Sequence, residues 1–443
     1  MQATSFSTSL PGRFLLTFLA VMALAAGLAR GQTTFTDPNA VNLEEFRVQG
    51  EYFGPITGGG NLGCWVHALG GDSYLITFLT GGLTTIPGEP GGGWDNVTKF
   101  KGQGGAASIS AQGYTAKITG SGFDRTMTGK TPDGKDFVLK RLARKSPLVG
   151  LKAPMGAKVL YGDKVIADAV NWTPADRGDP TGYLRQGVKS NFQHKDIQLH
   201  IELRTPFKPT GRGQERGNSG VYLQDRYEMQ VLESFGLDGT RDELGGIYGT
   251  LKSITNAALP PLNWQSLDCY FKAPVYDATG KIKNASMTVY LNGVLVQKDT
   301  PIDNATTAAG LNEGNSPGPI QLQDHGNPVF FNNIWLMEGN GIPWETLFAP
   351  VALAESPQGS GNGSFSEMGG GKWRLSGTAA LGLSSIRILG LDGSLLAVLR
   401  GEGEGNRIVN LERLHIQLRP GTYFLQADPR RVHNAVQKIT VLP

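Results

Sequence analysis

The sequence contains little cysteine and little charge, and both shortages limit the class of protein that it encodes. Only two cysteines, Cys64 and Cys269, occur in 443 residues, which excludes a fold built on disulfides. Charged residues make up 18% of the chain, and the formal net charge of +3 comes from interspersed acids and bases. The sequence therefore gives no electrostatic reason to expect nucleic acid as a partner. We expect both thiols to be buried, and a bridge between them stays open.

Most of the short motifs that mark catalytic or cofactor sites are also missing. No H-x-x-x-H or C-x-x-C spacing occurs, so a transition-metal site is not indicated. No G-x-S-x-G is present, and no Gly-x-Gly-x-x-Gly opens a helix after a strand. Residues 129–135 have the spacing of a phosphate-binding loop, but Asp136 replaces the Ser or Thr that would hold magnesium. Nucleotide-binding and serine-hydrolase activities are therefore not expected.

Long hydrophobic runs are absent except at the start of the chain. Arg13 precedes an almost wholly apolar run over residues 14–28, and small residues at Ala29 and Gly31 then offer a cleavage site before Gln32. The run is shorter than the roughly 20 residues that a membrane-spanning helix needs. We predict a signal peptide over residues 1–31 and a protein that is secreted, periplasmic or at the cell surface. A retained anchor or a lipid attachment stays as an alternative.

The chain is rich in turn-forming residues, and these separate many short runs of alternating polarity. Its 62 glycines and 25 prolines favour short strands joined by turns, so we predict an all-β fold with several domains. One predicted hairpin pairs residues 64–69 with 74–79, and another pairs 286–291 with 294–297 through Asn292-Gly293. The expected parts are a small β domain at 32–145 ending in a linker at 141–154, a β domain at 157–340, a flexible Gly/Ser spacer at 354–371, and a small β domain at 372–443.

The densest group of polar residues lies on a predicted strand in the central domain. Glu228 and Gln230 share one face of an extended strand, because side chains alternate with a period of two. A β-bulge between Val231 and Leu232 would bring Glu233 onto the same face. Two carboxylates would then be placed for acid–base chemistry on a sugar. The alternative is a strand whose polar face simply meets water.

Two further polar clusters, with flanking residues, are candidates for the same site. Residues 196–204 alternate strictly, so His200, Glu202 and Arg204 line one face of a strand. A tight turn over residues 321–327, before the last strand of the domain, brings amide, carboxylate and imidazole groups together. Each polar face can equally be an ordinary solvated one. A Trp in a β-rich chain more often packs in the core than stacks on a sugar ring. The complete set of additional candidates is Asn218, Arg226, Trp264, Gln323, Asp324 and His325.

Four ordered segments together resemble the 3-keto-disaccharide hydrolase domain family, a large bacterial family. They are residues 217–234, 247–249, 289–294 and 318–329. The resemblance implies a concanavalin-like jelly-roll sandwich related to family-16 glycoside hydrolases. In that relative a strand carries E-x-D-x-x-E, and residues 228–233 match its spacing with Gln230 in place of the aspartate.

The resemblance implies a secreted enzyme that cleaves the glycosidic bond of 3-keto-glycosides or disaccharides, by elimination followed by hydration. Glu228 or Glu233 would act as the base, with His325 or His200 as the acid. Arg204 and Gln230 would position the keto oxygen. A non-catalytic glycan-binding module of the same fold and a conventional glycoside hydrolase remain alternatives. No cofactor is implied, although a structural Ca²⁺ ion would suit this kind of sandwich.

Both flanking domains resemble domains of related bacterial proteins. Residues 48–95 resemble an accessory domain that precedes the central one. Residues 385–441 resemble the immunoglobulin-like sorting domain of the type IX secretion system, which implies the secretion machinery as a partner. An immunoglobulin-like domain without a sorting role is the alternative.

Overall fold

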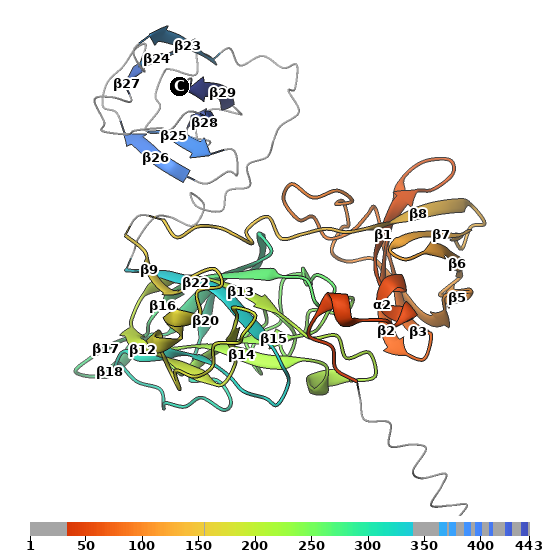
Figure 1. The fold of residues 1–443 in the computed structure, drawn as a ribbon, viewed down its shortest axis with the longest axis horizontal. Coiled ribbons are helices and arrows are strands. Elements are labelled where there is room, and N and C mark those ends of the chain that lie inside the picture. Colours follow the sequence, from red (N-terminus) through yellow and green to blue (C-terminus); the bar gives the residue numbers. More distant parts are fainter. Residues whose placement is uncertain are drawn as a thin grey trace, which may run out of the picture.

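The computed structural model describes residues 33–154 and 156–339, together with the backbone of seven strands between residues 363 and 441. The predicted signal peptide at 1–31 lies outside the described residues. Among the residues that the structure describes, no helix is long and apolar enough to cross a membrane. Antiparallel strands dominate (Figure 1), and the prediction of an all-β fold is confirmed.

The first part of the chain is a closed barrel of eight antiparallel strands, each paired with the next and the last paired with the first. The barrel is filled by aromatic side chains, among them Phe78, which stacks on Tyr114 with ring centroids 4.5 Å apart. The predicted hairpin is present, and its turn at Gly70-Gly71-Asp72 has a positive φ at all three residues. The strands are β1 (Gly50–Pro55), β2 (Asn61–Gly70), β3 (Ser73–Thr80), β4 (Lys99–Gly105), β5 (Ser108–Ala111), β6 (Tyr114–Ser121), β7 (Asp124–Lys130) and β8 (Asp136–Leu142).

Among the described residues, the helices are short and form no layer of their own. The helix α2 (Glu44–Val48) precedes the barrel, and its Phe46 packs in the barrel core. Single 3-10 turns are η1 (Pro38–Ala40), η2 (Ile166–Asn171) and η3 (Gly213–Glu215).

The central part is a sandwich of two antiparallel sheets, as predicted. The five-stranded sheet has the order β10 (Trp172–Thr173), β12 (Val188–His194), β21 (Gly318–Leu322), β14 (Asn218–Leu223) and β15 (Tyr227–Leu232). The seven-stranded sheet has the order β11 (Leu184–Arg185), β22 (Phe330–Glu338), β13 (Ile197–Arg204), β16 (Gln265–Lys272), β19 (Ala285–Leu291) and β20 (Val294–Ile302), with β9 (Lys158–Tyr161) paired to β22. A separate hairpin joins β17 (Val275–Asp277) and β18 (Gly280–Lys283).

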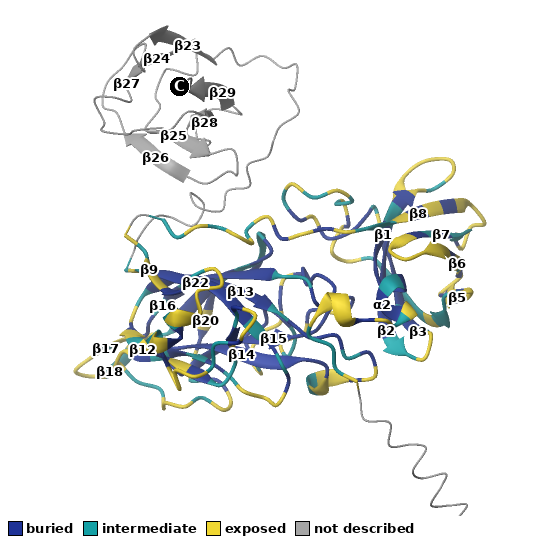
Figure 2. Cartoon of the chain, viewed as in Figure 1, coloured by how far each residue is buried: buried dark blue, intermediate teal, exposed yellow. Residues whose placement is uncertain are grey.

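The core between the two sheets determines which side chains face outward. Leu199 and Ile201 of β13 and Met229 and Val231 of β15 belong to one buried apolar cluster. Because side chains alternate along a strand, Glu228 lies on the outer face of the five-stranded sheet, and His200 on the outer face of the seven-stranded sheet. The sandwich strands are almost wholly buried in Figure 2, and exposed residues collect in the connecting turns.

The segment predicted as a linker at 141–154 joins the barrel to the sandwich and is docked on both. Arg144 is 3% exposed, and its Nε lies 2.7 Å from Glu51 of the barrel. Two residues later, Ser146 bonds to Ser266 of the sandwich at 3.0 Å. Residues 143–154 contain no helix or strand, but composition did not reveal that a basic side chain among them has a buried acidic partner.

We expect Thr84→Val to weaken the attachment of the barrel to the sandwich. The Thr84 hydroxyl is buried and donates to the Asn256 carbonyl at 2.8 Å, so valine keeps the shape but leaves a buried carbonyl without its donor. The loss should be about 1–2 kcal/mol, measured as a lower urea midpoint. The neighbouring Thr85 is exposed, and Thr85→Val is the matched control. Equal midpoints for the two variants would contradict the expectation.

The C-terminal strands form two antiparallel sheets. One has the order β23 (Gly363–Gly369), β24 (Lys372–Gly377) and β27 (Arg407–Asn410). The other has the order β26 (Leu395–Arg400), β25 (Ser385–Gly390), β28 (Gly421–Ala427) and β29 (Val436–Val441). The prediction of a spacer over 354–371 is wrong for residues 363–369, because their backbone pairs with β24.

Both cysteines are free and buried, as predicted. Cys64 lies in the barrel core and Cys269 in the sandwich core. Burial raises the pKa of each thiol well above its ordinary value, so neither is an activated nucleophile.

Candidate functional site

A row of polar side chains crosses the outer face of the five-stranded sheet, on the neighbouring strands β14 and β15. Tyr222 lies directly opposite Glu228, and Gly220 lies opposite Gln230. The pairing between these strands is regular from one end to the other. Their intervening residues, including Val221 and Met229, point into the core. The outward positions therefore form one continuous polar surface of the sheet, and Asn218, Tyr222, Glu228 and Gln230 on it are buried in the folded protein.

Glu228 is the carboxyl group at the centre of this surface. Its side chain is 1% exposed, and its Oε2 lies 2.7 Å from the Tyr222 hydroxyl. Burial raises the pKa of Glu228 to about 8, although the hydrogen bond from Tyr222 opposes that rise. The carboxyl group therefore changes its charge near neutral pH, which is what a general base or acid requires.

Glu228 occupies the space that Gly220 leaves by having no side chain. A Cβ at Gly220 would lie 2.8 Å from Cδ of Glu228 and still closer to its Oε1. The carboxyl group can lie flat against β14 only because residue 220 is glycine.

The Tyr222 hydroxyl connects Glu228 to the strands and loop around it. It receives a hydrogen bond from Gln323 Nε2 at 3.2 Å and has the Thr307 carbonyl 3.1 Å away as a second acceptor. Burial raises the pKa of Tyr222, and the neighbouring Glu228 adds to the effect. The hydroxyl can therefore donate to the ionised carboxylate, or accept from the protonated carboxyl while donating to Thr307.

Three amide side chains continue the row beyond Glu228. Gln230 Nε2 donates to Gln214 Oε1 at 2.9 Å, and Asn218 Nδ2 donates to the same oxygen at 2.7 Å. The Gln230 Oε1 atom is buried and has no hydrogen-bond partner within the described structure. A buried acceptor without a donor is unusual, and a sugar hydroxyl would satisfy it.

Arg226 is a structural residue, which corrects its prediction as a substrate-binding residue. Its Nε donates to the Asn312 carbonyl at 2.6 Å, and its Nη atoms bond to the carbonyl and hydroxyl of Ser316. The Arg226 carbonyl accepts from Thr306, whose Oγ1 in turn accepts from the Glu228 amide at 3.0 Å. Arg226 therefore holds the loop that covers Glu228.

Glu233 does not join Glu228, so the predicted bulge is wrong. The register of β14 and β15 is unbroken, and β15 ends at Leu232. The Glu233 carboxylate is buried and lies 2.5 Å from Nε of Arg216. The ion pair with Arg216, which lies outside the strand, fixes the direction of the Glu233 side chain. The spacing of residues along a strand cannot predict such a partner.

His200 and Glu202 are also separated from Glu228, because they lie on the outer face of the other sheet. The His200 ring is fully buried, with Nδ1 2.5 Å from Asp268 Oδ1. Burial lowers the pKa of His200, but Asp268 and Glu202 outweigh it and raise the pKa to about 9. The Gly150 amide donates to Glu202 at 2.6 Å, so the docked segment covers this cluster. The pairing of His200 with Glu228 as acid and base is therefore wrong.

Arg204 lies on β13, the strand of His200, and beside Trp264, which directly precedes β16. The guanidinium of Arg204 lies over the rings of Tyr183, Trp264 and Phe330, with centroid distances from 5.0 to 5.4 Å. Its charge is thus held by aromatic faces, and the predicted role at a keto oxygen beside Glu228 is wrong.

Gln323 lies beside the polar row. The turn that follows it, residues 324–326, is exposed. The Gln323 amide donates to the Gly220 carbonyl at 2.9 Å, which places Gln323 beside the polar row. Asp324 and His325 are exposed, and Asp324 Oδ1 accepts from the Gly326 amide at 2.9 Å. Among the predicted residues, the structure thus brings together Asn218, Glu228, Gln230 and Gln323.

Tyr222, Gln214 and Thr306 are site residues that the sequence interpretation missed. Tyr222 follows Asn218 and Gly220 at a spacing of two, so the alternation places it on the polar face. Its contact with Glu228 also needs the strand register, which the sequence does not state. Across the described parts of the chain, no cluster of three or more His, Cys, Asp or Glu side chains is arranged to hold a metal ion.

Comparison with known proteins finds a family model that matches the sandwich. Residues 162–337 match the model of the 3-keto-alpha-glucoside-1,2-lyase-like domain. No curated protein matches the chain.

Solved structures of three candidate glycosyl hydrolases from Parabacteroides distasonis ATCC 8503 are similar to parts of the chain. One is 32% identical, covers 42% of this chain and 86% of its own, and has a TM-score of 0.39. A second is 18% identical over 41% of this chain and 99% of its own, with a TM-score of 0.27. A third is 16% identical over 44% and 93%, also with a TM-score of 0.27.

Proposed function

We propose that this protein is an exported carbohydrate-active enzyme that cleaves the glycosidic bond of 3-keto-glycosides, with Glu228 as its base. The observation that carries the proposal is the buried carboxyl of Glu228, whose pKa is raised to about 8 and which lies 2.7 Å from a tyrosine hydroxyl. The family model that matches residues 162–337 supports a sugar with a 3-keto group as the substrate.

The proposed reaction is an elimination followed by addition of water. The 3-keto group acidifies the proton on C2, and the Glu228 carboxylate removes it. The electron pair of the C2–H bond forms a C1=C2 double bond while the C1–O bond breaks. The leaving oxygen takes the bond's electrons and is protonated by Glu228, which now carries the C2 proton, with Tyr222 as a relay. Water then adds its hydroxyl to C1 and a proton to C2.

The amides beside Glu228 supply orientation in this proposal. Gln230 Oε1 is buried without a donor, and in this proposal a sugar hydroxyl donates to it. Asn218 lies on the neighbouring strand β14, and Gln323, just after β21, donates from its backbone amide to Gly220, the residue opposite Gln230. Since one missing hydrogen bond to a sugar hydroxyl weakens binding, this row would select the position of the ring.

A conventional retaining hydrolase is disfavoured by the carboxylates that are present. Such an enzyme needs two carboxyl groups about 5–5.5 Å apart. The described neighbour of Glu228 on the same face is the amide of Gln230, and Glu233 is held by Arg216. A non-catalytic glycan-binding module is the second candidate, and the row of amides favours it.

The test is to incubate the protein with a 3-keto-glucoside that bears a chromogenic aglycone, beside its unoxidised parent. Release from the keto compound alone supports elimination. Release from the parent alone means a conventional hydrolase. If neither releases the aglycone and glycans nevertheless bind, the chain is a binding module and the proposal fails.

The pH dependence of kcat/KM should follow the ionisation of Glu228. The base must be a carboxylate, and its pKa is raised to about 8, so kcat/KM should rise about tenfold per pH unit below pH 8 and level off above it. Initial rates between pH 5 and pH 10 check this. A profile that is already flat at pH 6 would show that a different group limits the reaction.

A further inference from the structure

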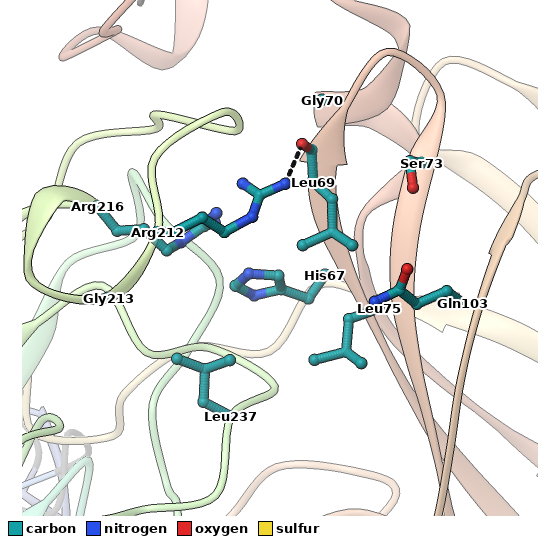
Figure 3. A pocket seen from close by; sticks show the side chains of 10 residues that line it. All are labelled: His67, Leu69, Gly70, Ser73, Leu75, Gln103, Arg212, Gly213, Arg216 and Leu237. Atoms are coloured by element: carbon teal, nitrogen blue, oxygen red, sulfur yellow. Dashed lines mark hydrogen bonds between the residues drawn. The ribbon is translucent and has the colours of Figure 1, made fainter.

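A cavity of about 560 Å³ lies where the barrel meets the sandwich. Figure 3 shows its two sides: Leu69, Leu75 and Gln103 come from barrel strands, and Arg212 and Leu237 come from loops of the sandwich. Its volume is in the range that suits a small molecule or a sugar unit. Nothing in the proposed reaction uses this cavity.

The cavity is cationic. Arg212 bonds to the carbonyls of Pro209, Gly211 and Leu69, and has no carboxylate partner among the residues that the structure describes. Arg216 is 2% exposed and is neutralised by Glu233, whose Oε2 lies 2.5 Å from both Nε and Nη2 of the guanidinium. No carboxylate is present among the described residues that line the cavity. An anionic group would therefore meet the positive charge of Arg212, which no described carboxylate neutralises.

His67 adds a neutral polar group to the same wall. It is 1% exposed, and Nδ1 donates to the Phe235 carbonyl, so Nε2 is left as an acceptor. Burial and then the charge of Arg216 lower the pKa of His67 well below its ordinary value. An acceptor next to two arginines suits a ligand that carries a hydroxyl beside its negative charge.

The rest of the lining suits a sugar better than a bare anion. Leu69, Leu75 and Leu237 provide apolar surface for the C–H face of a pyranose ring, and Ser73 and Gln103 offer hydrogen bonds to hydroxyls. A free phosphate or sulfate would make no use of the leucines.

We propose that this cavity is a second binding site, and that its ligand is a sugar unit bearing a carboxylate, as in a uronic acid. Arg212 holds the carboxylate, and the leucines pack against the ring. The choice of a sugar rests on the proposed function, whereas the choice of an anion rests on the cavity's own residues.

This site is connected to the row of polar residues by one short loop. Arg212 precedes η3, and Gln214 within η3 accepts the hydrogen bonds of Gln230 and Asn218. A ligand that holds Arg212 therefore also holds the segment that presents Gln214 to Gln230. The acidic unit would position this loop beside the reacting sugar.

The test is isothermal titration of the full chain with methyl β-glucuronide, beside methyl β-glucoside and sodium sulfate. We expect the glucuronide to bind at least tenfold more tightly than either of the others. Arg212→Gln should weaken the glucuronide at least tenfold. Arg241→Gln, which changes an exposed arginine, should leave its affinity unchanged. Sulfate binding as tight as that of the glucuronide, or an unchanged affinity in Arg212→Gln, would overturn the proposal.

The same titration on Glu228→Gln separates this proposal from the proposed function. Glucuronide binding should persist in that variant, because Glu228 does not line the cavity. If the wild-type protein cleaves no 3-keto-glycoside and still binds the glucuronide through Arg212, the proposed function fails and the second site stands. If binding disappears in Glu228→Gln while the fold is retained, the ligand occupies the polar row instead, and the second site is overturned.

Discussion

Glu228→Gln is expected to lower kcat for aglycone release from a 3-keto-glucoside by about 10²–10⁴-fold, the range for loss of a general base. Glutamine has the same shape and keeps an acceptor for the Tyr222 hydroxyl, which lies 2.7 Å from Glu228. It cannot take a proton from C2, so binding should survive while turnover is lost. Steady-state kinetics with the chromogenic substrate measure both.

The stability of Glu228→Gln shows whether a loss of rate comes from unfolding. The pKa of Glu228 is raised from 4.5 to about 8, so its contribution to stability is fully present below pH 4.5 and is lost as the pH rises through 8. Glu228→Gln carries no such penalty, and it should be at least as stable as the wild type at pH 9. Glu215→Gln makes the same change at an exposed glutamate and should leave the rate unchanged. Equal kcat values for Glu228→Gln and Glu215→Gln would remove Glu228 from the mechanism.

Gly220→Ala should reduce kcat about 100-fold although it removes no ionisable group. The added Cβ would lie 2.8 Å from Cδ of Glu228, so the carboxyl group has to move. A displacement of about 1 Å from the reactive geometry is enough for a loss of that size. The measurement is kcat for the 3-keto-glucoside, together with the circular dichroism spectrum and melting temperature.

The matched change is Gly314→Ala, where the nearest atoms to an added Cβ are 3.8 Å away. That variant should keep both rate and stability. Overpacking in Gly220→Ala should cost about 1–3 kcal/mol, which a folded protein can absorb. Wild-type kcat in a folded Gly220→Ala would show that the position of the Glu228 carboxyl group does not control the rate.

The sequence predicts the strands of this protein well because side-chain alternation is a local property. Leu199 and Ile201 alternate with His200 and Glu202, and this pattern correctly divides β13 into a core face and an outer face. The pattern does not tell whether an outer face is open. Residues 146–154 cover the outer face of β13, so His200 is buried with Asp268 instead of meeting a substrate.

The sequence predicted the residues of the candidate site only where two strands that are adjacent in the sheet also follow each other in the chain. Glu228 and Gln230 lie on β15, directly after β14, and a tight turn brings Asn218 beside them. Glu233 was assigned to the site on spacing alone, and its direction depends on Arg216, a partner outside the strand. Gln214 reaches the site from a 3-10 turn, where no periodic pattern exists to predict it.

The docked segment at residues 146–154 has a consequence for how this protein can be divided. The family match begins at residue 162, yet Leu151 accepts hydrogen bonds from Asn333 and Trp335, and Gly150 donates to Glu202. A fragment cut at the family boundary would open His200, Asp268 and Glu202 to water and remove β9 from the edge of β22. Gly150, Leu151 and β9 thus complete the sandwich from outside the matched residues. We expect a chain that begins at residue 162 to be less stable than one that begins at residue 146.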